Sequence, residues 1–192
     1  MVLGGRMKYS ASIQYTPDNI RLLSTAVNNT FRYKLKLLYV FCCAALMFTG
    51  VILGIDSTAG IACVAIGCFF IPSMNTLEKN QANRLVRQLK GKVIRVTYQF
   101  LEDSFTCFDS KEQQNIQYDS IIRILNAKNH LYLFPNTNQA FMIEKSSINP
   151  HDEKNFERFL SQKIGLEWTT PISVWTLNVK NIKFIRRNTK RR

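Results

Sequence analysis

Apolar residues along the chain are concentrated in one block that ends before the middle of the sequence. Residues 37–55, LLYVFCCAALMFTGVILGI, and residues 57–77, STAGIACVAIGCFFIPSMNTL, contain no charged side chain. At about 1.5 Å per residue the first run makes roughly 28 Å of helix, close to the thickness of a bilayer core. A helix of a soluble protein keeps a polar stripe, and neither run has one. The pattern predicts a transmembrane hairpin at residues 37–74, with helices at about 37–55 and 58–74.

One acid, Asp56, separates the two apolar runs. A charge in the middle of a bilayer costs several kcal/mol, so we expect Asp56 in the turn of the hairpin, hydrated at the far interface. There its carboxylate would cap the second helix, near the positive end of that helix. An intramembrane acid that relays protons is the disfavoured alternative.

Small residues predict how the two helices pack. Gly50 and Gly54 form a GxxxG pair in the first helix, and Ala59, Cys63 and Gly67 recur every four residues in the second. Small side chains at this spacing let helix backbones approach closely. We expect these residues to join the two helices, with an oligomeric contact through the same faces as the alternative.

The polar segments beside the hairpin predict two more helices. Residues 1–36 form an N-terminal arm, in which the extended piece KYSASIQYT precedes an amphipathic helix that begins at Thr16-Pro17-Asp18. The leading MVLGGR carries no structural signal, and Met7 is an alternative start to Met1. Residues 75–91 form a connecting helix, with Asn75 and Glu78 in a capping box and Gly91 at its end.

After residue 92 the apolar period changes from helical spacing to alternation. KVIRVTYQF and SFTCFD have the pattern of strands, and three or four further short strands follow before residue 146. A capped amphipathic helix, INPHDEKNFERFLSQKIG, completes the segment. Antiparallel strands followed by one helix predict a small β-barrel or roll at residues 92–165, with the helix covering an open end. The chain as a whole is predicted to be an α+β membrane protein.

Charge predicts the orientation of the hairpin. The 192-residue chain has a formal net charge of +13, and its Lys and Arg residues flank the apolar block on both sides, while the turn has none. The positive-inside rule therefore places both termini in the cytoplasm. The flanking residues are Arg21, Arg32, Lys34 and Lys36 before the block, and Lys79, Arg84, Arg87, Lys90 and Lys92 after it.

Residues 166–192 form a basic tail in which Trp168, Trp175 and Phe184 are interleaved with cations. This composition is typical of an interfacial anchor on anionic headgroups, and it also suits an acidic protein partner. A nucleic-acid arm is disfavoured because the chain is already tethered to a membrane, and a solvated terminus stays an alternative. The basic residues of this surface are Lys180, Lys183, Arg186, Arg187, Lys190, Arg191 and Arg192.

The sequence contains no recognisable catalytic or metal-binding motif. Four of the five cysteines lie in the apolar block, none has zinc-ligand spacing, and His130 and His151 belong to no known arrangement. No glycine-rich loop that could hold a phosphate is present. The acids of the strand region are interpreted as solvated surface residues: Asp103, Asp109, Glu112 and Asp119. We therefore predict no enzymatic activity, no metal and no cofactor.

The order of these parts resembles the YcxB-like family of bacterial membrane proteins, over roughly residues 7–165. The similarity lies in the polar hairpin at 110–114, in YDSIIRI at 118–124 and in HLYLFPNTNQAFMIEKSSI at 130–148. Ile143-Glu144-Lys145 departs from an Ile-Pro-Lys-like step of the family, and Ser146-Ser147 stands where an aromatic residue is usual. The resemblance implies a pleckstrin-homology-like cytoplasmic module and a location in the bacterial inner membrane, and it supplies no catalytic residues.

Together these features predict a non-enzymatic, multi-pass membrane protein whose cytoplasmic module works by binding. It would be a subunit, scaffold or regulator of a membrane complex. An accessory or immunity factor of a transporter is one such role. Expected partners are anionic lipid headgroups and another membrane protein, with homo-oligomers as a further alternative. The second hypothesis, an oligomeric transport or channel component, is disfavoured because a water-filled path needs polar residues inside the helices.

Overall fold

The computed structural model describes residues 7–73, 76–109 and 112–171, which form two compact units. One unit combines the segment up to Val27 with residues 85–171, and the other begins at Asn28 and runs to Arg84. The first unit contains all of the described strands and the last helix. The predicted α+β organisation, with antiparallel sheets followed by a C-terminal helix, is confirmed.

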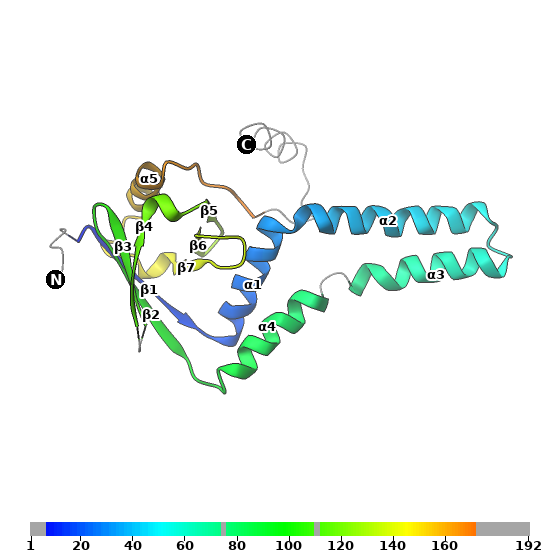
Figure 1. The fold of residues 1–192 in the computed structure, drawn as a ribbon, viewed down its shortest axis with the longest axis horizontal. Coiled ribbons are helices and arrows are strands. Elements are labelled where there is room, and N and C mark those ends of the chain that lie inside the picture. The colour runs from blue at the N-terminus through cyan, green and yellow to red at the C-terminus, as the bar shows by residue number, and fades with distance from the viewer. Residues whose placement is uncertain (1–6, 74–75, 110–111, 172–192) are drawn as a thin grey trace. The chain divides into compact units, whose positions relative to one another are not determined.

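The larger sheet has four antiparallel strands in the order β1-β2-β3-β4 (Figure 1). These are β1 (Tyr9–Tyr15), β2 (Ile94–Phe100), β3 (Ser104–Phe108) and β4 (Gln113–Gln117). The smaller sheet has three antiparallel strands in the order β5-β6-β7. They are β5 (Arg123–Asn126), β6 (His130–Phe134) and β7 (Phe141–Glu144), and the short 3-10 turns η1 (Tyr118–Ser120) and η2 (Lys145–Ser147) adjoin this sheet in sequence.

Strand β1 belongs to the larger sheet, whereas the sequence-based division placed it in a separate N-terminal arm. Tyr9 lies opposite Phe100 and Tyr15 lies opposite Ile94 in an unbroken register. Ala11 and Ile13, two residues apart, are buried because alternate side chains of a strand face the same side of its sheet. The folded unit therefore includes a strand from each side of the apolar block.

Helix α5 (Glu153–Ile164) covers the aromatic core of this unit. The Asp152 side chain caps the helix by accepting from the backbone N–H of Asn155 at 3.1 Å, and Gly165 ends the helix with φ +72°. The Phe156 ring packs edge-on against the Phe100 ring, with 4.9 Å between their centroids. This packing buries the apolar side of the helix, as its sequence pattern predicts.

Four helices connect β1 to β2: α1 (Pro17–Phe31), α2 (Tyr33–Ile52), α3 (Thr58–Ser73) and α4 (Thr76–Gln88). Figure 1 shows α2 and α3 as an antiparallel pair joined by a short turn. Among the described helices, α2 alone is long and apolar enough to cross a membrane, because the apolar stretch of α3, Thr58–Ile71, is shorter. These findings support one of the two predicted membrane helices by length and composition.

The turn between α2 and α3 contains Asp56, which is exposed. The prediction that Asp56 caps α3 is wrong, because the Ser57 hydroxyl accepts from the backbone N–H of Gly60 at 2.9 Å and so takes the capping role. Helix α2 ends before the predicted residue 55, since Gly54 adopts a positive φ of +87° that turns the chain.

Candidate functional site

A pocket of about 420 Å³ lies in the sheet unit, beside the N-terminus of α5. Three segments form its walls: the β5–β6 turn, the end of β7 with η2, and the loop that leads into α5. The walls carry both signs of charge, from Lys128, Glu144, Lys145, Asp152 and Glu153. A polar pocket of this kind suits a small charged ligand or a charged side chain of a partner.

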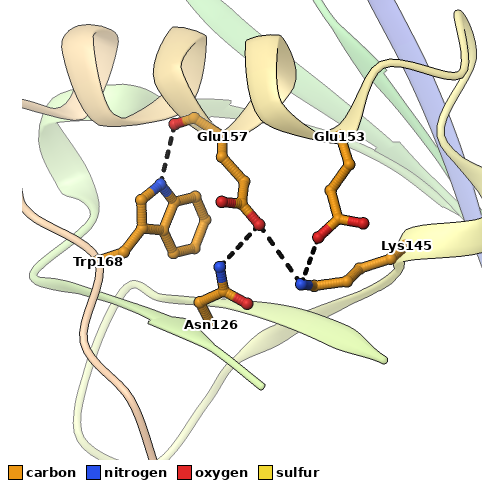
Figure 2. A network of polar contacts seen from close by, with 5 residues as sticks. All are labelled: Asn126, Lys145, Glu153, Glu157 and Trp168. Carbon is orange, nitrogen blue, oxygen red and sulfur yellow. Dashed lines mark hydrogen bonds and ion pairs between the residues drawn. The ribbon is translucent and has the colours of Figure 1, made fainter. Parts of the chain in front are cut away.

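Lys145 lines this pocket and also lies at the centre of a network of polar contacts (Figure 2). Its ammonium group pairs with the Glu153 carboxylate and lies 3.4 Å from Oε1 of Glu157, and only 14% of the side chain is exposed. The amide of Asn126, from β5, donates to the same Glu157 oxygen at 2.7 Å. The hydrogen bond from Lys145 is the main cause that lowers the pKa of Glu153. Lys145 is therefore engaged in fixing α5 to the smaller sheet.

The segment after α5 is attached to the same place. The Trp168 indole N–H donates to the main-chain carbonyl of Glu157 at 2.9 Å (Figure 2). Thr169 lies beside β5, where its backbone N–H donates to Ile124 at 3.2 Å and its carbonyl accepts from Asn126 at 2.7 Å. Trp168 was predicted to be an interfacial aromatic of the tail, but the structure places it against the folded unit because its indole N–H finds an acceptor on α5.

Burial shifts the pKa values of several other groups of the unit in the direction that favours their neutral forms. Burial is the main cause that raises the pKa of the Cys107 thiol to about 11, and burial also raises the pKa values of Tyr15 and Tyr98, whose hydroxyls are 3.4 Å apart. Partial burial lowers the pKa of His130, while Glu144, opposite it on β7, acts in the other direction. In the part of the chain that the structure describes, no three His, Cys, Asp or Glu side chains gather as metal ligands.

The structure places the predicted helix-packing residues at different positions in the hairpin. A Cβ atom on Gly50 would lie 2.7 Å from the Gly60 carbonyl oxygen, and one on Gly67 would lie 3.1 Å from the Cys43 carbonyl oxygen. Both glycines are therefore at the close contact between α2 and α3.

The remaining three predicted residues are not all at this contact. Gly54 is in the turn, where its carbonyl oxygen is the nearest neighbour of a Cβ atom placed on Gly60, whereas Ala59 is exposed and Cys63 is half-buried. The buried small residue beside Ala59 is Gly60, so the contacting stripe of α3 is displaced by one residue at this end.

Tyr39 makes a contact between the two hairpin helices that the sequence analysis did not predict. Its hydroxyl donates to the Phe70 carbonyl at 2.9 Å and lies 3.0 Å from the Ser73 hydroxyl, near the end of α3. It links the two helices at the end opposite the turn, where a carbonyl of the last helical turn needs a donor. The signal in the sequence was a single tyrosine within an apolar run.

The basic tail residues Lys180, Lys183, Arg186, Arg187, Lys190, Arg191 and Arg192 lie outside the described residues, as do Trp175 and Phe184. The capping residue Asn75 is also outside them.

These observations define an α+β module with a polar pocket. The same chain also forms a pair of apolar helices, α2 and α3. In the comparison with protein families, residues 100–161 match the model described as YcxB-like protein. The match covers about a third of the chain, from the end of β2 into α5, and confirms the resemblance drawn from the sequence. The comparisons with curated proteins and with solved structures gave no match.

Proposed function

We propose that the protein is an integral membrane protein whose folded module works by binding, as a subunit, scaffold or regulator of a membrane complex. The observation that carries this proposal is the exposed apolar surface of α2. Only 11% of the apolar stretch of this helix is buried, and the side chains of Phe41, Phe48 and Ile52 are each about 70% exposed. Each large apolar side chain left in water forgoes about 1.5–3 kcal/mol, so this helix needs lipid or protein around it.

Helix α3 would cross the membrane beside α2. Its 16 residues give about 24 Å of helix, somewhat less than a bilayer core, and the local bilayer would thin or polar flanks would reach outward. Phe69 on α3 is 72% exposed, which repeats the pattern of α2. The close packing at Gly60 and Gly67 makes the two helices one inserted element.

The distribution of charge supports the orientation and location. Basic residues precede α2 and follow α3, and the exposed turn between these helices has one charge, that of Asp56. With the basic flanks inside, both termini lie in the cytoplasm, which agrees with the bacterial inner membrane implied by the family resemblance. Under the same resemblance, the two sheets and α5 correspond to a pleckstrin-homology-like module.

The chemistry of the pocket supports a binding role. Its central cation, Lys145, is held by two carboxylates, and the Cys107 thiol elsewhere in the unit has a raised pKa of about 11. Such groups stabilise a surface and do not act as activated nucleophiles. Anchoring would raise the effective concentration of the module for partners in the same membrane.

Labelling of single cysteines in intact cells tests the topology. In a variant whose five native cysteines are replaced by alanine, Asp56→Cys should react with a membrane-impermeant maleimide added outside. Asn136→Cys, an exposed position in the module, is the matched control and should react only after lysis. Labelling of Asp56→Cys only after lysis, or recovery of the chain in the soluble fraction without detergent, would contradict the proposal.

Affinity purification from native membranes tests the binding role. Co-purification of a different membrane protein is the expected result, and the charge-reversed variant Lys128→Glu, at an exposed position that lines the pocket, should weaken it if the pocket takes part. A symmetric homo-oligomer that conducts ions in vesicles would instead support the transport hypothesis.

A further inference from the structure

Strand β4 forms an open edge of the larger sheet. At the opposite edge, β1 is covered: Ser10 and Asn149 exchange two backbone hydrogen bonds of 2.8 Å each, and the Ser147 hydroxyl accepts from the N–H of Ser12 at 2.9 Å. Within residues 7–73, 76–109 and 112–171, no strand pairs with the outer side of β4. The outer edge of β4 is therefore available to an added strand.

The register of the β3–β4 hairpin shows which backbone groups point outward. The N–H of Asp109 donates to the carbonyl of Glu112 at 3.0 Å, so this pair is hydrogen-bonded. Because bonded and non-bonded pairs alternate in an antiparallel ladder, Gln114 and Ile116 bond to β3, and Gln113, Asn115 and Gln117 turn their backbone groups outward. Of these outward groups, the Gln117 carbonyl already accepts from the Ser120 hydroxyl at 2.7 Å.

The sequence of β4 lacks two of the features that usually protect a sheet edge, although the strand is short at five residues. QQNIQ has no proline and no charged residue, and four of its five side chains are exposed. Exposed edges without such features readily pair with another extended segment. The edge is thus chemically suited to strand addition, in which main-chain hydrogen bonds supply the affinity.

In residues 103–120, which include this edge, four acidic residues outnumber one basic residue, Lys111, although the protein as a whole is basic. Asp109 and Glu112 flank the turn before β4, and Asp119 follows the strand; all three are exposed. Asp103 lies near the far end of the strand, where its charge contributes to the raised pKa of Tyr118. A second copy of β4 would bring two such acidic rims together, and like charges repel, so the charge favours a basic strand as the occupant.

We propose that the outer edge of β4 binds the basic C-terminal segment of the same chain, residues 172–192. This segment has seven Lys and Arg residues and no acid, so its charge complements the rim. The part VWTLNVKNIKFI is rich in the β-branched and aromatic residues that favour strands.

The length of the segment allows it to reach the edge. The described chain ends at Pro171, and 21 further residues span at most about 70 Å when extended. A folded unit of roughly this size has a radius of gyration of only about 13 Å, so the segment can reach β4 from any point on the surface. Tethering in the same chain gives an effective concentration of the order of millimolar, which favours binding in cis.

Hydrogen–deuterium exchange of the full chain in uncharged detergent tests the proposal. The outward amides of Gln113, Asn115 and Gln117 should exchange at least tenfold more slowly in the wild type than in a chain that stops after Pro171. Equal exchange in the two proteins would overturn it. The amides of α5 around Phe156 should be unchanged, which would show that both proteins are folded.

A pair of substitutions at one position separates strand addition from charge attraction alone. Asn115→Pro removes an outward N–H that β3 does not use, a position where an edge strand tolerates proline. It should accelerate exchange of residues 176–187 about tenfold, while Asn115→Thr, which keeps the N–H, should not. If both variants leave that exchange unchanged, the segment does not pair with β4.

Further exchange measurements distinguish binding of the segment to β4 from binding to lipid or to a second copy of the chain. Changing Lys180, Lys183, Arg186 and Arg187 to Gln should expose β4, whereas neutralising Lys79, Arg84, Arg87 and Lys90 as a matched control should not. Protection of the segment that appears only on nanodiscs with anionic phosphatidylglycerol would assign it to lipid and overturn the proposal. Protection that is lost on dilution would assign it to a second copy, with the same consequence.

Discussion

The indole N–H of Trp168 and the main-chain carbonyl of Glu157 are joined by a hydrogen bond of 2.9 Å. The carboxylate of the same Glu157 contacts Lys145 and Asn126, so one residue of α5 holds three segments that are far apart in sequence. This arrangement explains why the chain turns back along β5 after α5.

Replacing Trp168 by Phe should lower the free energy of unfolding by about 1 kcal/mol, because it removes the donor and keeps an aromatic ring. Trp168→Ala should cost more, since the half-buried ring is lost as well. Urea unfolding in uncharged detergent, followed by circular dichroism, measures both. A Phe variant as stable as the wild type would show that the hydrogen bond contributes nothing.

Gly60→Leu should destabilise the α2–α3 pair by about 1–3 kcal/mol, the usual cost of overpacking. A Cβ at this position would lie 2.8 Å from the Gly50 carbonyl oxygen, which belongs to the backbone and cannot rotate away. Ala59→Leu is the matched control, because Ala59 is exposed and should accept the larger side chain with little change. Thermal unfolding of the two variants in detergent gives the comparison, and equal melting temperatures would refute the assignment of Gly60 to the contact.

The stability of the sheet unit should fall as the pH is lowered from 7 to 5, in part because of His130. Its pKa in the folded protein is below the ordinary value of 6.5, so the unfolded chain binds the proton more readily in this range. The His130 contribution is complete above pH 6.5 and decreases below it. His130→Gln should therefore flatten the pH dependence. Glu153, whose pKa is lowered from 4.5, titrates at more acidic pH and does not interfere.

Cys107 should react slowly with iodoacetamide at pH 8. A pKa of about 11, compared with an ordinary 9.0, reduces the thiolate fraction about 100-fold, since each pKa unit is a factor of ten. Mass spectrometry of the Cys107 peptide measures the rate, with the urea-unfolded protein as the reference. Asp109→Asn should raise the rate, because the Asp109 charge is the second cause of the shift. A folded-state rate equal to that in urea would contradict the burial of this thiol.

The sequence predicted correctly those strands and helices whose signals lie within one short stretch of the chain. The strands after residue 92 and the capped helix α5 show their period and end signals in short stretches of sequence. The pairing of β1 with β2 could not be predicted in the same way, because it joins residues 79 to 91 positions apart and alternation alone does not identify a partner.

The sequence-based predictions for Ala59 and Trp168 are wrong for similar physical reasons. The contacting stripe of α3 includes Gly60 and not Ala59 because the chain direction after Gly54, with φ +87°, sets which face of the helix meets α2. Trp168 was assigned to an interface because aromatic and basic residues alternate there, but the acceptor that it finds is on α5, a tertiary contact that composition does not reveal.

The pairing of β1 with β2 has a consequence for biosynthesis. Both strands are needed for the larger sheet, yet the whole of α1 to α4 is translated between them. A nascent chain therefore holds its first strand without a neighbour until β2 (residues 94–100) has been synthesised, which happens after both apolar helices have been synthesised. The hairpin is thus complete before the sheet can close, and an N-terminal strand waiting in this interval is a natural client for a chaperone.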